Sequence, residues 1–170
     1  PRGEPVNLLR LPQSDQFSLV WEHDPALDRE RLDSEHAADA TKPKFSDAYK
    51  QAQETLDWSP LLKPGESATV FRCRPLVGVF GQRIRDLVYS GGLGPSEGLG
   101  VAFRMSCAGI DGWGPPLPKF TRSIDKEHRT LGEMLSVECF NALCERAGNE
   151  LAENLGSQIL KRSSSLTPLP

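Results

Sequence analysis

The sequence predicts a mainly helical α+β fold: a small compact module with a short edge strand or hairpin, and extended N- and C-terminal arms. Apolar residues make up only 38% of the 170-residue chain, whereas roughly 45–50% is usual in globular proteins when glycine is counted. The 14 prolines and 15 glycines indicate much irregular backbone. Apolar side chains nevertheless recur at helical spacing in several stretches and alternate in two short ones, which predicts a small core.

Residues 1–57 are expected to form an extended acidic N-terminal arm with one strand and one or two helices. The opening residues, through Leu11, are expected to be extended. Apolar and polar side chains alternate from Phe17 to Glu22, with Phe17, Leu19 and Trp21 on one face, so this stretch predicts the strand.

Two helices are expected in the rest of the arm. Asp24 followed by Pro25 is typical of a helix start and predicts a helix to about Ala40. That helix has little apolar surface, so we expect it to be solvated or bound to a partner. A second helix is expected from a cap at Ser46 through Leu56.

Residues 58–162 are expected to form the compact helical α+β module. Alternation over Ala68–Leu76 predicts a strand, and Pro75 places it at a sheet edge or ends it. Apolar residues at helical spacing predict a helix over residues 77–88, and a further helix is expected from about 96 to 108.

The end of the module is expected to be helical. After a loop over residues 110–118, Ser123 is predicted to cap a helical region. Four apolar residues spaced four apart mark this region: Leu131, Leu135, Cys139 and Leu143. A last helix is expected around Leu151, Leu155 and Ile159, followed by an irregular C-terminal tail over 163–170.

Charge divides the chain unevenly. Residues 1–60 hold 7 basic and 12 acidic side chains, whereas residues 61–130 hold 10 and 6. Such a chain suits charge-complementary neighbours or copies of itself, and the acidic stretch 25–40 is expected to select basic neighbours. Nucleic acid is not expected as a partner, because it would need a concentrated basic face. A nucleic-acid-binding module built on the arginines of 72–104 stays open as an alternative.

The sequence predicts no enzyme, no cofactor and no metal site. The four cysteines form no C-x-x-C pair and have no histidine at zinc-ligand spacing, so buried thiols are expected. Ser123 and Lys126 match S-x-x-K, which leaves a hydrolase as a further alternative. A helix cap explains Ser123 better, because the companion motifs of that enzyme class are missing.

Large apolar side chains in the arms and loops are the predicted partner-binding residues. Aromatic side chains in such places either cover a small core or insert into another subunit. The predicted anchors are Val6, Leu8, Leu9, Phe17, Trp21, Phe45, Trp58 and Trp113.

Two stretches carry a resemblance to a known group of proteins. The first is the LKPGESATVFRCRPL sequence of residues 62–76, and the second is the ENLGSQILKRSSSLT sequence of residues 153–167. Together they resemble the opening and the ending of small morphogenesis proteins from tailed bacteriophages, over roughly residues 60–167. The resemblance implies a non-enzymatic part of the virion or of its assembly, and implies no catalytic residues.

The predicted function is therefore that of a structural component of a tailed-phage virion, an accessory head or tail protein that binds neighbouring subunits through its arms. The expected partners are other virion structural proteins, such as major capsid or tail proteins, and copies of itself. A tail-assembly chaperone that leaves the mature particle is the alternative. No apolar run approaches the roughly 20 residues needed to span a bilayer, so we expect the host cytoplasm during assembly and then the virion.

Overall fold

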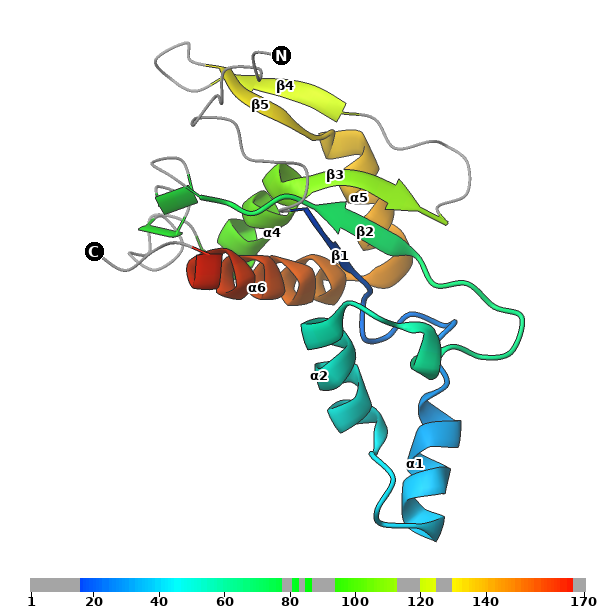
Figure 1. Ribbon diagram of the computed structural model, residues 1–170. Helices are drawn as coiled ribbons and strands as arrows, with labels where there is room; N and C mark the ends of the chain where they lie inside the picture. Colours follow the sequence, from blue (N-terminus) through cyan, green and yellow to red (C-terminus); the bar gives the residue numbers. More distant parts are fainter. Residues whose placement is uncertain are drawn as a thin grey trace, which may run out of the picture.

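The computed structural model describes residues 16–77, 81–82, 85–86, 94–112, 120–124 and 130–166. It confirms the α+β, mainly helical fold class (Figure 1). In chain order the elements are β1 (Phe17–Leu19), α1 (Arg29–Ala38), α2 (Phe45–Thr55), the 3-10 turn η2 (Ser59–Leu61), β2 (Val70–Cys73), α4 (Pro95–Ser106), β3 (Cys107–Asp111), β4 (Phe120–Ile124), β5 (Thr130–Leu135), α5 (Val137–Ala147) and α6 (Asn149–Leu166). None of the helices described is long and apolar enough to cross a membrane.

A three-stranded antiparallel sheet lies at the centre of the main module. Its order is β1-β2-β3, with Phe17 opposite Cys73 and Phe71 opposite Ile110. The predicted alternation in β2 is confirmed, because Phe71 and Cys73 are buried while Arg72 is exposed. Of the two alternatives expected from Pro75, the strand end is the one observed: β2 is the middle strand of the sheet and ends at Cys73. Pro75 lies beyond its end, so the missing proline N–H does not interrupt the ladder.

The main core lies between this sheet and the helices α4, α5 and α6. Phe103 of α4 is fully buried and meets the Phe71 ring edge-to-face at 5.6 Å between centroids. Helix α6 packs closely against α4 at Gly156, where an added Cβ would collide with the backbone carbonyl of Leu99. The predicted last helix is confirmed in α6, whose Leu151, Leu155 and Ile159 are buried.

Two stretches of the predicted helical region are strands. Residues 107–111 form β3 rather than the end of a helix and a loop, and residues 120–124 and 130–135 form the β4–β5 hairpin. The stripe of apolar residues that begins at Leu131 runs from a strand into α5, because a spacing of four fits both periods. Ser136, rather than Ser123, caps that helix by accepting a hydrogen bond from the Cys139 N–H at 3.2 Å.

Helix α6 also takes in part of the predicted tail. It continues to Leu166, and Ser163 is buried within it. The Ser163 hydroxyl donates to the Ile159 carbonyl at 2.7 Å and accepts from the Leu76 N–H at 2.9 Å, which ties the helix to the segment after β2. Residues 167–170 of that tail lie outside the described residues, as does most of the helix expected over 77–88.

A second hydrophobic cluster gathers residues between Val20 and Ala68. Helices α1 and α2 and the turn η2 enclose it, and Phe45, Tyr49 and Trp58 are its aromatic members. Tyr49 stacks on Phe45 and packs against Trp58, with ring centroids 5.9 and 5.1 Å apart. The described part of the predicted arm is therefore folded, and we call it the N-terminal lobe, residues 20–68.

Local hydrogen bonds set where the lobe's helices begin. Asp28 caps α1 through the Arg31 N–H, so the helix starts one turn later than the expected cap at Asp24. Asp24 instead ties two loops together, because its carboxylate accepts the N–H groups of Ala26 and Thr69, both at 2.8 Å. Helix α2 begins two residues earlier than predicted, with Lys44 rather than Ser46 at the cap position, and ends within one residue of the prediction.

The close approach of α6 to α4 generates a stability prediction. Replacing Gly156 with alanine puts a methyl group against rigid backbone, so we expect Gly156→Ala to lower the free energy of unfolding by about 1–3 kcal/mol. The neighbouring Ser157→Ala change, at an exposed position of the same helix, is the control and should be nearly neutral. Urea denaturation of both variants measures this, and equal stability of the two would contradict the packing described.

Candidate functional site

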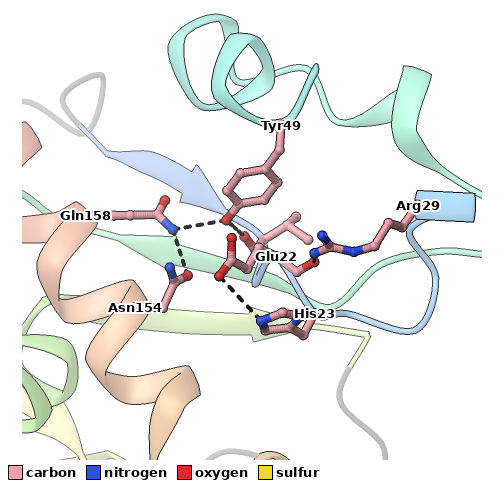
Figure 2. Close-up of polar contacts among 7 residues, drawn as sticks. Glu22, His23, Arg29, Tyr49, Asn154 and Gln158 are labelled. Atoms are coloured by element: carbon pink, nitrogen blue, oxygen red, sulfur yellow. Dashed lines mark hydrogen bonds and ion pairs between the residues drawn. The ribbon is translucent and has the colours of Figure 1, made fainter. Parts of the chain in front are cut away.

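The N-terminal lobe meets the main module along a seam between α2 and α6. Tyr49 lies at this seam, and its hydroxyl donates to the Val20 carbonyl at 2.6 Å (Figure 2). The same oxygen accepts from the Gln158 side-chain amide at 3.0 Å, and that amide also donates to Asn154 at 2.8 Å. Burial raises the pKa of Tyr49 to about 12, so the hydroxyl keeps its proton and its donor role at neutral pH.

Arg162 makes a second link across the seam. Its guanidinium donates to the Gln53 carbonyl at the end of α2, at 2.8 Å, and lies over the Phe17 ring at 5.2 Å from the centroid. A guanidinium that lies over an aromatic face keeps its positive charge. Arg162 is therefore both a structural tie and a cation at the edge of the seam.

The seam opens into a groove of about 590 Å³ that we call the seam groove. Its walls come from α2 and α6, and Leu19 of β1 contributes apolar surface. Three cations and one carboxylate line it, together with uncharged side chains that can form hydrogen bonds: Lys50, Lys161, Arg162, Glu54, Gln53, Ser157 and Gln158. The lining thus carries a net positive charge in a chain whose total charge is −3.

A second hollow, of about 390 Å³, lies among α4, α5 and α6. Its charges nearly balance, since Arg104 faces Glu97 and Glu153 among otherwise uncharged lining residues. It contains the partly buried Phe140 and the thiol of Cys144. The seam groove carries the larger net charge of the two, because its lining has three cations to one carboxylate, and a net charge selects the charge of a ligand.

Most carboxylates in the acidic stretch of the N-terminal lobe, residues 24–39, accept hydrogen bonds from groups of the same chain. Five of its carboxylates bind groups of this chain: Asp24, Asp28, Asp33, Glu35 and Asp39. Hydrogen bonds from Thr41 lower the pKa of Asp39, for example. Glu30 stays exposed at the start of α1. Much of the acidity that the sequence offers to basic neighbours therefore supports local backbone and caps.

Three of the arginines considered for a nucleic-acid face each contact a different part of the chain. Arg72 pairs with Asp111 at 3.1 Å on the sheet surface. Arg85 donates to the Leu76 carbonyl at 3.2 Å, and Arg104 donates to the Leu135 carbonyl at 3.0 Å. Each of these three is engaged within its own chain, so they do not form the free, concentrated basic face that a phosphate backbone needs.

Three of the predicted partner anchors are core residues, which corrects that prediction. Phe17, Phe45 and Trp58 are 5%, 1% and 7% exposed, so they already fill the chain's own clusters and cannot insert into another subunit. Trp21 is half-buried and packs against the main core. Four further predicted anchors lie outside the described residues: Val6, Leu8, Leu9 and Trp113.

The thiols follow the expected pattern of buried side chains. Cys73, Cys107 and Cys139 are buried in the main core, and Cys144 is partly buried. Burial raises the pKa of Cys107 to about 12, and burial also raises the pKa of Cys73 well above its ordinary value. Within the described ranges, no group of three or more His, Cys, Asp or Glu side chains is placed to hold a metal ion.

The hydrolase alternative requires Ser123 and Lys126 to lie one turn apart on a helix. Ser123 lies in β4, so the one-turn helical spacing that would bring Lys126 beside it does not arise there. Lys126 lies outside the described residues.

Comparison of the chain with protein-family models, with curated proteins and with solved structures found no match.

Sequence reasoning missed the seam groove. The only local signals are the adjacent cations Lys161 and Arg162 near the end of a predicted helix, and Lys50 beside the buried Tyr49. Their meeting depends on packing between segments about a hundred residues apart, which no local pattern encodes.

The Tyr49 hydroxyl generates a stability prediction. We expect Tyr49→Phe to lower the free energy of unfolding by about 1–3 kcal/mol at pH 7, because the Val20 carbonyl and the Gln158 amide both lose a partner. Above pH 10 the unfolded tyrosine ionises while the buried one keeps its proton to about pH 12. Wild-type stability then falls by about 1.4 kcal/mol per pH unit from this group. The difference between wild type and variant should therefore narrow from pH 10 to 12, and a constant difference would contradict the assignment.

The thiol environments generate a labelling prediction. With dithionitrobenzoate at pH 8, we expect about one thiol per native chain to react, and mass spectrometry should place the label on Cys144, because the other three are buried. All four should react in guanidinium chloride. Fast labelling of Cys73 or Cys107 in the native chain would show that the core is less closed than described.

Proposed function

We propose that the chain is a non-enzymatic structural component of a tailed-phage virion, an accessory head or tail protein, and that it binds a neighbouring subunit in the seam groove. The observation that carries the proposal is the groove's lining, in which cations and amides from two separate elements face one hollow. Ammonium, guanidinium and amide groups arranged in this way recognise charge and hydrogen-bonding groups. The contact surface is thus a formed groove, rather than the aromatic anchors of an arm.

The virion setting rests on the resemblance to phage morphogenesis proteins. One of its motifs, Lys63-Pro-Gly-Glu66, forms the turn before β2, with Gly65 at φ 75° and the Glu66 N–H donating to the Lys63 carbonyl at 3.1 Å. The other begins at Glu153 and includes Asn154 and Gln158, which belong to the seam network (Figure 2). The second stretch therefore contributes to the groove, since Ser157, Gln158, Lys161 and Arg162 line it, whereas the first forms the turn that leads into the central strand of the sheet.

The proposed neighbours are other virion structural proteins and copies of this chain. A groove with a net positive charge speeds encounter with an acidic surface and disfavours basic partners. In a symmetric particle such a contact is repeated at every copy, so moderate affinity at each site is enough for firm attachment.

Particle composition tests the proposal. We expect the chain to be present in purified mature particles at a copy number that matches a symmetry of the head or tail. The double variant Lys50→Glu, Lys161→Glu should be incorporated about tenfold less or worse, because both walls of the groove then repel the partner. Lys42→Glu, an exposed charge reversal outside the groove, is the matched control and should be incorporated normally. Quantitative mass spectrometry of the particles measures all three proteins.

Two results would contradict the proposal. A chain that is abundant during assembly but missing from mature particles would identify the tail-assembly chaperone instead. Equal incorporation of the double variant and the Lys42→Glu control would show that the partner does not contact the groove.

A further inference from the structure

The residues that line the seam groove are also the residues that hold the two parts of the chain together. Gln158 lines the groove and donates to Tyr49, and Arg162 lines it and donates to the Gln53 carbonyl. The groove therefore exists in this form only while α2 is seated on α6. Any ligand that binds both walls must also favour the seated arrangement.

Like charges face each other across this seam. Lys50 stands on α2, while Lys161 and Arg162 stand on α6, and all three line the same hollow. Repulsion between Lys50 and these two cations opposes the seating of α2 on α6, and Glu54 on α2 offsets only part of it, since the lining keeps a net positive charge. An anionic ligand between the walls is attracted to the cation of α2 and to those of α6, which outweighs the repulsion between the walls. The sign of the effect is thus fixed: binding of an anion and seating of the lobe assist each other.

Resting on the proposed function of the groove as a partner site, we propose that it clamps an acidic segment of a partner protein, and that this binding is coupled to the seating of the N-terminal lobe on α6. A hollow of about 590 Å³ holds a few residues of such a segment. Tyr49 is the positioning residue of the device, because its two hydrogen bonds fix α2 without requiring contact with the ligand.

The surroundings of the groove favour a protein segment over nucleic acid. Glu54 lies in the lining, and Asp47 is on the same exposed face of α2, about two turns before it. A continuous phosphate backbone would be repelled by these carboxylates. A protein segment can instead place its own carboxylates beside the lysines and its uncharged groups beside Glu54.

The Gln158 side chain adds a second reason. Its carbonyl oxygen is buried and has no hydrogen-bond partner among the residues described. A main-chain N–H of a peptide could satisfy this acceptor after a small movement at the seam, whereas a DNA backbone carries no donor. In the seated arrangement this buried carbonyl lacks a hydrogen bond from the described part of the chain, which costs free energy. That cost brings the seated and unseated arrangements closer in free energy.

Peptide binding to the full-length chain tests the partner chemistry. The probe is a fluorescent octaglutamate peptide, with octaglutamine and a short DNA duplex of matched length as the comparisons, in low and in moderate salt. We expect octaglutamate to bind more tightly than either, and Lys50→Glu, Lys161→Glu to weaken it at least tenfold while Lys42→Glu does not. Lack of octaglutamate binding at low salt, or tighter binding of DNA, would overturn the inference of an acidic protein segment.

Hydrogen exchange tests the coupling. Saturating octaglutamate should slow the hydrogen exchange of the α2 amides of the wild-type chain. Binding to a site that is not coupled to the seating of α2 would leave this exchange rate unchanged. Tyr49→Phe should weaken octaglutamate binding by about tenfold, because the seated state is less populated and apparent affinity falls with its fraction. Unchanged α2 exchange on binding, or unchanged affinity in Tyr49→Phe, would overturn the coupling.

The outcomes separate this inference from the proposed function. If particles contain the chain and lose the double variant, but octaglutamate does not bind, then the proposed function stands and the partner chemistry is wrong. If octaglutamate binds as expected while mature particles lack the chain, then the inference stands and the virion setting is wrong.

Discussion

The buried hydroxyl of Tyr49 is the constraint on which the arrangement of this chain depends. The backbone passes between two hydrophobic clusters at neighbouring residues, because strand alternation sends Leu19 into the main core and Val20 into the cluster of the N-terminal lobe. Tyr49 donates to the carbonyl at this crossing and accepts from Gln158 on α6. The Tyr49 oxygen thereby links the lobe to the end of the first strand and to α6 through two hydrogen bonds. The seam groove follows from that relation, since its walls are the elements that Tyr49 joins.

The acidic stretch of the lobe shows why net charge is a poor guide to partners at this scale. The loop that contains Asp24 and the start of α2 leave backbone N–H groups that need acceptors, and the nearby carboxylates supply them. Arg31 is held between Asp28 and Glu35 and also donates to the Pro60 carbonyl, so it ties α1 to η2. Charge that looks available in the sequence is thus used in folding a small lobe. The basic residues of the groove, by contrast, come from distant elements that meet at the surface.

How much could be predicted from the sequence depends on the range of each signal. Helices α2 and α6 and the strands β1 and β2 were predictable because their periods run unbroken over several residues. Strand β3 was missed because Gly109 is typical of a helix end, whereas here it lies under the Arg72 side chain in the ladder, where a Cβ would collide with the guanidinium. The lobe's core was missed because small residues such as Ala48, Ala52 and Ala68 complete it around a few aromatic rings. A count of large apolar residues does not detect that kind of core.

Burial of Phe17, Phe45 and Trp58 changes the kind of assembly that physical chemistry favours for the proposed role. An arm that orders on its partner loses conformational entropy at the moment of binding, so it needs a large apolar contact to reach a given affinity. A lobe that is already folded has met that cost during folding and can bind through a small charged groove. Such a contact depends on salt and forms quickly. The walls of the groove are the elements that Tyr49, Gln158 and Arg162 hold together, so under the proposed binding the residues that seat the lobe would also set the affinity.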